Sequence, residues 1–350
     1  MGTKDATKPI IDTKGKEIEQ IGIVVHDAAK TAMRYSEIFG IGPWLFLDIV
    51  PTEIILHDKP LVDVDSCIRI AMTNLGKIQI ELLQPLNGPS THMEFLREHG
   101  EGIHHVSFGM VDNHDQIVSA FKEQGIGIEM QGLLGGAITF SYMSTQKELG
   151  TIFEVVKPIP PGVQSSLKSW GTFEPKKPGL INLKGKEIRQ IGIVVKDAEK
   201  AAKHYWEILG IGPWVLIDFK PPHVSDGILH GISMSDTDIH IKAALADYGN
   251  IQFELLQPVY GASTHMDFLR TRGEGVHHVS FGEVDDHDEF VSVLTDQGIG
   301  VESTGLLGGG AITFTYMATQ KDLGTIFELV KVHPGVENTI VPYGTYPSSQ

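Results

Sequence analysis

In each half of the sequence, four polar side chains stand in β-rich apolar runs, where a half-buried strand calls for an apolar residue. Each half of the chain holds one glutamine, one histidine and two glutamates of this kind: Gln20, Glu81, His105 and Glu154, then Gln190, Glu254, His278 and Glu328. A lone buried carboxylate is costly, so each glutamate needs a cation or a hydrogen-bond donor. An amide oxygen, an imidazole and two carboxylates form a hard donor set that suits a divalent ion. The pattern therefore predicts metal binding.

For each of these residues taken singly, a structural role is the alternative. A histidine in a strand is more often a satisfied core or edge residue, and a glutamate in a strand more often faces solvent. Metal binding is favoured because all four residues recur as a set at equivalent points of both halves. The second half is not independent evidence, because a recent duplication would preserve the set anyway.

The two sets belong to a tandem duplication. The string KGKEIEQIGIVVHDAAK returns as KGKEIRQIGIVVKDAEK, and the correspondence continues along most of each half. A repeat of this length predicts a domain rather than a solenoid unit. We expect domains over residues 15–157 and 184–332, tails over 1–14 and 333–350, and a linker over 158–183. The Pro, Gly and Ser content of this linker predicts an extended segment on the surface.

Each half divides again into two βαβββ patterns. IEQIGIVV predicts a strand, DAAKTAMRYSEIFG a helix ended by Gly40, and WLFLDIV, CIRIAMTN and KIQIELLQP three more strands. HHVSFGMV, HDQIVSAFKEQG, GIGIEMQ, AITFSYM and TIFEVVK repeat that order. The fold class is thus predicted as α+β, with four βαβββ modules in two paired-module domains and a helix on one face of each sheet. Curling the modules around a ligand cleft would cover the other face.

The amino-acid composition narrows the classes of molecule that this protein could bind. The 350 residues include 44 acidic and 28 basic side chains, a formal charge of −16 that disfavours nucleic acid. No apolar run is long enough to span a membrane. The single cysteine, Cys67, cannot form an internal disulfide, and the first residues lack an apolar signal region. We expect a cytoplasmic protein with a small-molecule partner, no membrane association and no nucleic acid.

The strings QIGIVV, KIQIELLQP, GEGIHHVSF and GTIFEVV resemble the vicinal oxygen chelate superfamily, which has a glyoxalase-like fold. ELLQPL followed by FLREHGEGIHHVSF is most similar to methylmalonyl-CoA epimerase, with glyoxalase I a second relative. The resemblance implies an epimerase-type dimer fused into one chain, a pseudo-dimer whose further oligomerisation stays open. It also implies a divalent ion (Co, Mn, Ni, Zn or Mg) in each pair of modules, up to two per chain. Its ligands would be the two sets named above.

One departure bears on the reaction. The epimerase pattern has histidine where this chain has Gln20 and Gln190, and a Gln–Glu–His–Glu set is instead similar to that of animal glyoxalase I. With a single histidine in each set, the chain also differs from the ring-cleaving dioxygenases, whose iron site has two histidines and one carboxylate.

The resemblance implies a metal-dependent isomerase, epimerase or racemase that abstracts a proton next to a carbonyl, through a metal-stabilised enolate. A glyoxalase-like base would be Glu154 or Glu81 in one half, and Glu328 or Glu254 in the other. An epimerase-like base would be Asp65 or Asp238, for which a turn at a strand edge is an equal alternative. A glyoxalase I-like lyase acting on a thiol adduct, and a non-catalytic antibiotic-type binding protein, are the alternative functions.

Further matched residues are candidates for substrate binding, although packing explains them equally well. They are Trp44, Trp214, Tyr142, Tyr316, Met143, Met317, Arg69 and Lys242. His104 and His277 precede the proposed ligands, so strand alternation predicts that they point to the opposite face and have a supporting role. His92 and His265 follow predicted helix caps and are expected in the core or on the surface. The GLLGG and GLLGGG loops are expected to be turns or lids.

Overall fold

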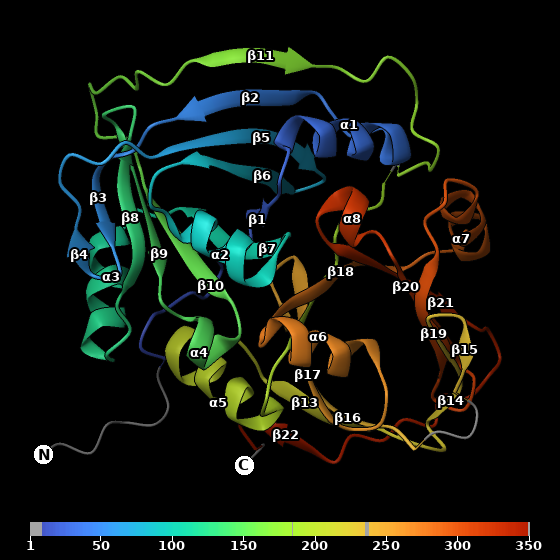
Figure 1. Cartoon of the computed structure of the whole chain (residues 1–350). Coiled ribbons are helices and arrows are strands. Elements are labelled where there is room, and N and C mark those ends of the chain that lie inside the picture. Colours follow the sequence, from blue (N-terminus) through green and yellow to red (C-terminus); the bar gives the residue numbers. More distant parts are fainter. Residues whose placement is uncertain (1–8, 184, 235–237, 349–350) are drawn as a thin grey trace, which may run out of the picture.

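The computed structural model describes residues 9–183, 185–234 and 238–348. Residue 184, the expected start of the second domain, lies outside the described residues, as do the outer ends of both expected tails. The described chain forms two sheets, one from each half, which we call domain 1 and domain 2 (Figure 1).

Domain 1 contains eleven strands in one sheet. They are β1 (Gln20–Val24), β2 (Trp44–Ile49), β3 (Thr52–Leu56), β4 (Lys59–Pro60), β5 (Cys67–Leu75), β6 (Ile78–Asn87), β7 (Gly102–Met110), β8 (Ile128–Leu134), β9 (Ile138–Met143), β10 (Ile152–Lys157) and β11 (Ser169–Phe173). Its helices are α1 (Ala28–Phe39), α2 (Thr91–His99), α3 (His114–Glu123) and α4 (Gln146–Leu149).

Domain 2 repeats this order. Its strands are β12 (Gln190–Val194), β13 (Trp214–Phe219), β14 (Val224–Leu229), β15 (Ile232–Ser233), β16 (His240–Tyr248), β17 (Ile251–Tyr260), β18 (Gly275–Glu283), β19 (Val301–Leu307), β20 (Ile312–Met317), β21 (Ile326–Val332) and β22 (Gly344–Tyr346). Its helices are α5 (Ala198–Leu209), α6 (Thr264–Arg272), α7 (His287–Asp296) and α8 (Gln320–Leu323).

The strand order confirms the prediction of four βαβββ modules in an α+β fold. In domain 1 it is β11-β2-β5-β6-β1-β7-β10-β9-β8-β3-β4, so the first strands of the two modules, β1 and β7, lie antiparallel at the centre. The hairpin of β3 and β4 is an addition that the sequence patterns did not indicate, whereas the helix α2 between the modules begins at the predicted cap before His92. Every module also has its predicted helix.

Capping residues bound the helices, and α1 ends at the predicted Gly40. The Asp27 side chain accepts a hydrogen bond from the backbone N–H of Lys30 at the start of α1. At its end, Gly40 adopts the left-handed conformation with φ of 67°, which glycine reaches without steric cost. Ser90 caps α2 in the same way as Asp27.

A continuous hydrophobic core joins the two domains. Helix α1 of domain 1 packs against domain 2, where the Tyr35 ring lies 6.2 Å from the ring of Phe327 and its hydroxyl donates to the carbonyl of Leu323 at 2.9 Å. In return, Tyr205 of α5 lies 6.0 Å from Phe153 of domain 1. Figure 1 shows α1 beside α8 and α5 beside α4. Each sheet is therefore packed by helices of its own domain, such as α1 against β5 and β6, and these helices in turn contact the other domain.

The expected linker and C-terminal tail each contribute an edge strand. β11 pairs with β2, where the Trp170 ring lies 5.0 Å from Phe46 and Arg69 lies over the Trp170 ring. β22 pairs with the equivalent strand β13. Pairing of this kind satisfies backbone groups that an open sheet edge would leave exposed.

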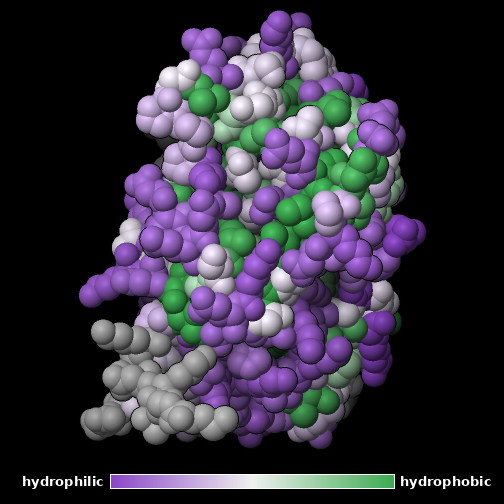
Figure 2. Space-filling view, turned by 90° about the vertical axis from the view of Figure 1, so that its left-hand side faces the viewer, coloured by the Kyte–Doolittle hydropathy of each residue, from purple (hydrophilic) through white to green (hydrophobic). Residues whose placement is uncertain are grey.

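The surface mixes polar and apolar residues. On the face in Figure 2, hydrophobic side chains are interspersed among hydrophilic ones. Within the described ranges, no helix combines the length and the apolar character needed to cross a bilayer.

Candidate metal centres

Each sheet curves around a cleft that contains most of its predicted ligand set. The cleft of domain 1 has a volume of about 880 Å³ and is lined by Gln20, Glu81 and Glu154. The cleft of domain 2 has a volume of about 700 Å³ and is lined by the equivalent residues Gln190, Glu254 and Glu328. Every lining residue of each cleft comes from one domain and the linker or tail that follows it. The chain thus holds two separate sites.

His105 lies fully buried beneath the cleft of domain 1 because the strand beside it offers no side chain at that point. Gly22 of β1 pairs with both His105 and Glu81. A Cβ atom added to Gly22 would overlap the His105 imidazole, and Gly192 has the same relation to His278. Each glycine leaves a space that the imidazole of the proposed ligand fills.

The imidazole and the two carboxylates of each set face one another. His105 Nε2 lies 3.6 Å from Glu81 Oε2 and 3.8 Å from Glu154 Oε2. In domain 2, His278 Nε2 lies 3.5 Å from Glu254 and 3.7 Å from Glu328. These separations exceed the hydrogen-bond range but lie within the about 4.2 Å that two bonds of about 2.1 Å to one ion can span.

Buried atoms without partners support this arrangement. Among the described residues, His105 Nε2, Glu154 Oε2 and His278 Nε2 are buried and make no hydrogen bond. Such orphaned groups are rare in folded proteins and call for an explanation. The Gln20 amide nitrogen donates to Gln79 Oε1 at 2.8 Å, which leaves its oxygen available as a ligand. The residues therefore fit a divalent ion.

Burial raises the pKa values of three of the four proposed glutamate ligands. Burial, and secondarily the charge of Glu154, raises the pKa of Glu81 well above its ordinary value. Burial raises the pKa of Glu154 to about 7, against hydrogen bonds from Ser107 and Tyr142 that lower it. Burial likewise raises the pKa of Glu328 to about 7. A divalent ion would replace the protons that these carboxyl groups otherwise retain.

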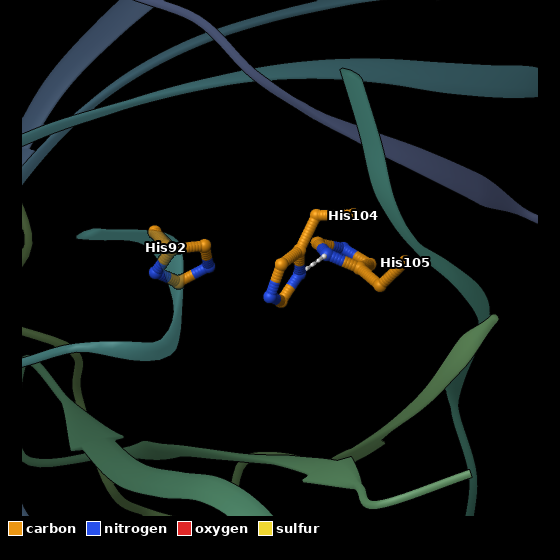
Figure 3. A group of neighbouring side chains, drawn as sticks. All are labelled: His92, His104 and His105. Atoms are coloured by element: carbon orange, nitrogen blue, oxygen red, sulfur yellow. Dashed lines mark hydrogen bonds between the residues drawn. The ribbon is translucent and has the colours of Figure 1, made fainter. Parts of the chain in front are cut away.

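His104 supports His105 directly, contrary to the expectation that the two side chains point to opposite faces. Where β7 pairs with β1, Gly22 pairs with His105 but the next residue pairs with Ile103, so His104 is an extra residue in a β-bulge. The bulge turns the His104 ring toward its neighbour, and the two Nδ1 atoms lie 3.1 Å apart (Figure 3). His104 Nε2 lies 3.1 Å from Thr91 Oγ1 of α2.

Two buried histidine triads could hold an ion on distance alone within the described residues. They are His92, His104 and His105, and His265, His277 and His278. A neutral imidazole has one donor and one acceptor nitrogen, and both nitrogens of His104 already face hydrogen-bond partners. We therefore favour the set containing the glutamates as the ligands. The triad would then keep Nε2 of His105 directed at the ion.

Comparisons with known proteins agree with this architecture. The family model of the Glyoxalase/Bleomycin resistance protein/Dioxygenase superfamily matches residues 19–140 and again residues 189–316. The chain belongs to this superfamily. Its two matched regions fall in the two domains and agree with the tandem duplication.

Three proteins to which this superfamily member is similar share less than a quarter of their aligned residues with it. An uncharacterized protein, YqjC, from Bacillus subtilis (strain 168) is 23% identical over 151 residues, 40% of this chain and 91% of its own length. A mutant of 4-hydroxymandelate synthase from Streptomyces coelicolor has a similar fold over 93% of this chain and 95% of its own, with a TM-score of 0.56 and 14% identity. Methylmalonyl-CoA epimerase from Mycobacterium tuberculosis matches 42% of this chain and 88% of its own length, with a TM-score of 0.31 and 22% identity.

Tyr142 and Tyr316 are the predicted pocket residues that the superfamily fold brings beside the centres. The Tyr142 ring lies 4.7 Å from that of His105, and its hydroxyl hydrogen bonds to Glu154. Tyr316 has the same relation to His278 and Glu328. Both rings are buried, so they flank the ligands without lining the open part of the cleft.

The other predicted pocket residues lie away from the clefts. Trp44, Trp214, Met143 and Met317 are fully buried in the shared core. Arg69 pairs with Asp48 at 2.7 Å, and Lys242 pairs with Glu199 at 3.0 Å, so both cations are already neutralised at the rim of a sheet. Apolar and aromatic residue types fit a core as well as a pocket, and the structure places these four in the core.

Asp65 and Asp238 also lie outside the clefts. Both are exposed, and their carbonyl groups pack against Gly88 and Gly261 at the turns that end β6 and β17. Both residues thus lie in turns at strand ends, the alternative role considered for them, and neither faces the proposed ion.

Sequence reasoning missed several residues at the mouths of the clefts. Glu19 and Lys77 line the mouth in domain 1, and their counterparts Arg189 and Asn250 line it in domain 2. Leu167 of the linker and Ile340 of the tail cover one side of each cleft. The differences between the two copies at these positions were the signal that could have identified them.

Proposed function

We propose that this protein is a divalent-metal-dependent isomerase, epimerase or racemase that removes a proton from the carbon next to a carbonyl group. One observation carries the proposal: an imidazole and two carboxylates converge beneath each cleft, and in both sites the imidazole Nε2 that faces the carboxylates is buried without a hydrogen bond to any described residue. The proposed partner is a small carbonyl compound. A cytoplasmic location stays a prediction from composition.

The proposed ligands in domain 1 are Gln20, Glu81, His105 and Glu154, and an ion held there would stabilise negative charge on a neighbouring carbonyl oxygen. Glu81 or Glu154 would take the proton from the substrate carbon and return it. In domain 2, Glu254 or Glu328 would do the same. The cleft walls include Leu45, Leu47, Ile49 and Phe140, apolar side chains that exclude water from this proton transfer.

A glyoxalase I-like lyase acting on a thiol adduct is the second candidate. The specific observation in its favour is the amide ligand, because a Gln–Glu–His–Glu set is similar to that of animal glyoxalase I. An iron dioxygenase is disfavoured because each proposed set has one histidine, whereas that chemistry uses two histidines and a carboxylate. The likeness to 4-hydroxymandelate synthase concerns the fold alone.

The first experiment measures metal content. Wild-type protein, the Glu154→Gln and Glu328→Gln variants and their double variant would be loaded with Co²⁺, Mn²⁺, Ni²⁺, Zn²⁺ or Mg²⁺, desalted and analysed by plasma mass spectrometry. We expect two ions per chain, one in each single variant and none in the double variant. Glu123→Gln, at an exposed glutamate of α3, is the matched control and should keep two ions. Failure of every metal to bind would contradict the proposal and favour a non-catalytic binding protein.

The second experiment separates the two reactions. Methylmalonyl-CoA and other acyl thioesters with a stereocentre beside the carbonyl would be incubated with loaded protein in deuterated water and followed by NMR. An epimerase exchanges the α-proton without a thiol cofactor, and the double variant should not. Turnover only of the hemithioacetal formed from methylglyoxal and glutathione would instead support the lyase.

A further inference from the structure

Domain 2 contains a second cavity beside its metal cleft. Its volume is about 280 Å³, and Phe314 lines both spaces. The cavity lies between the hairpin of β14 and β15, strand β19 and the start of α6; β14, β15 and β19 are at the right of Figure 1. Val224, Leu229 and Ile241 give it an apolar wall.

One polar group in this cavity has no partner. His265, on the first turn of α6, lines the cavity and is only 5% exposed. Neither of its ring nitrogens makes a hydrogen bond with any described residue. Thr264 and Thr304 also line the cavity, but their hydroxyl groups are bonded to His277 and to the Phe314 carbonyl. A buried unpaired imidazole costs free energy that a ligand's polar group would recover.

In domain 1, larger side chains fill the space that is equivalent to this cavity. The pairing of β3 with β8 and of β14 with β19 makes Met130 the counterpart of Ser303, and Ile54 the counterpart of Gly227. Met130 and Ile54 are buried in a cluster with Phe140. Domain 2 has thus lost side-chain volume at two adjacent points of one site. In domain 1, His92 Nε2 also reaches the Tyr142 hydroxyl at 3.3 Å.

We propose that domain 2 binds a neutral small molecule in this cavity, with a compact apolar body and one hydroxyl or carbonyl group that hydrogen bonds to His265. The cavity's described lining residues include no lysine or arginine, and Asp226 is its only carboxylate, so an anion has no counter-charge there. Burial lowers the pKa of His265 to about 3, in keeping with a neutral imidazole. The His265 ring lies 4.7 Å from that of His277, so a bound molecule would adjoin the support of the metal centre.

The test uses benzyl alcohol as the probe, with toluene and benzoate as comparisons, in calorimetric titrations of the metal-free full-length protein. We expect one equivalent of benzyl alcohol to bind, and toluene and benzoate to bind at least about fivefold more weakly, as expected for a lost hydrogen bond and for an unpaired charge. Because no metal is present, the result does not depend on the proposed catalytic function.

The domain 1 counterparts supply matched variants. Ser303→Met restores the residue that fills domain 1 and should weaken benzyl alcohol binding at least about tenfold, whereas a Met130→Leu variant in domain 1 should not change it. Ser303 is a better site than Gly227, where an added Cβ would lie 3.3 Å from the Cβ of Met234. His265→Phe should remove the preference for benzyl alcohol over toluene. Unchanged binding in Ser303→Met, tighter binding of benzoate, or no binding of benzyl alcohol would each overturn the proposal.

Discussion

At the scale of single residues, the most informative observation is that the imidazole and the two carboxylates of each set are buried together, while the Nε2 atoms of His105 and His278 make no hydrogen bond within the described chain. Glu154 and Glu328 each have a pKa raised to about 7 by burial, above their ordinary value of 4.5. A carboxyl group with a raised pKa stabilises the folded state while it is protonated. That contribution is complete below about pH 4.5 and is lost as the pH rises through about 7.

A pH dependence of stability follows for the metal-free protein. Between about pH 5 and 7.5, the free energy of unfolding of wild type should fall relative to that of the Glu154→Gln and Glu328→Gln double variant, by up to about 3 kcal/mol per site. Adding Co²⁺ should stabilise wild type more at the higher pH, because metal binding displaces protons. Denaturant titrations of both proteins across this range check it. Parallel curves for the two proteins would contradict the assigned shifts.

A second prediction concerns His104, which we interpret as a support that fixes His105. His104→Phe should weaken Co²⁺ binding in domain 1 about 10–100-fold and leave domain 2 unchanged, because the Nδ1 atom of His105 loses its partner. His277→Phe is the matched variant and should affect domain 2 alone. Two-site calorimetric titration measures both constants. If instead His104→Phe abolishes binding and Glu154→Gln preserves it, the histidine triad is the metal site.

At the scale of elements, the βαβββ order was predictable because period-two alternation and cap residues such as Asp27 and Gly40 are local signals. The bulge that turns His104 toward His105 was not predictable from the sequence, because it depends on pairing with a strand that is distant in the sequence. For Trp44 and Asp65 the sequence left a structural role and a role in the site equally open, because residue type does not say which face of a sheet a side chain meets. The edge strand within the linker has mixed composition and forms only by pairing with β2.

The contact between β1 and β7 supports a prediction about Gly22. Gly22→Ala should displace the His105 ring, remove the ion from domain 1 and destabilise the fold by about 1–3 kcal/mol through overpacking. Gly171→Ala is the control, because a Cβ there meets no other atom within 4 Å. Metal analysis and denaturant titration should show that the control matches wild type. A Gly22→Ala protein that retains two ions would contradict the placement of His105.

At the scale of the whole molecule, the two domains share one core, so they should unfold in a single transition.

Two equivalent tyrosines, Tyr35 and Tyr205, test how closely the packing of the two halves matches. Tyr35 donates to the Leu323 carbonyl across the domain interface, whereas the hydroxyl of Tyr205, equally buried, makes no hydrogen bond within the described chain. Tyr35→Phe should therefore cost about 1 kcal/mol, and Tyr205→Phe should be neutral or slightly stabilising. Thermal unfolding of both variants measures the difference, and equal losses would contradict it.

The segments before the two domains occupy matching places. The N–H groups of Ile10 and Ile11 donate to the carbonyls of Glu207 and Ile208 of α5, and those of Leu180 and Ile181 donate to Glu37 and Ile38 of α1. Each half is therefore held to the other through the segment that precedes it, by backbone hydrogen bonds that need no covalent link between the halves. A gene divided within that link should yield two polypeptides that reassemble, as two subunits of an ancestral homodimer would have done before fusion.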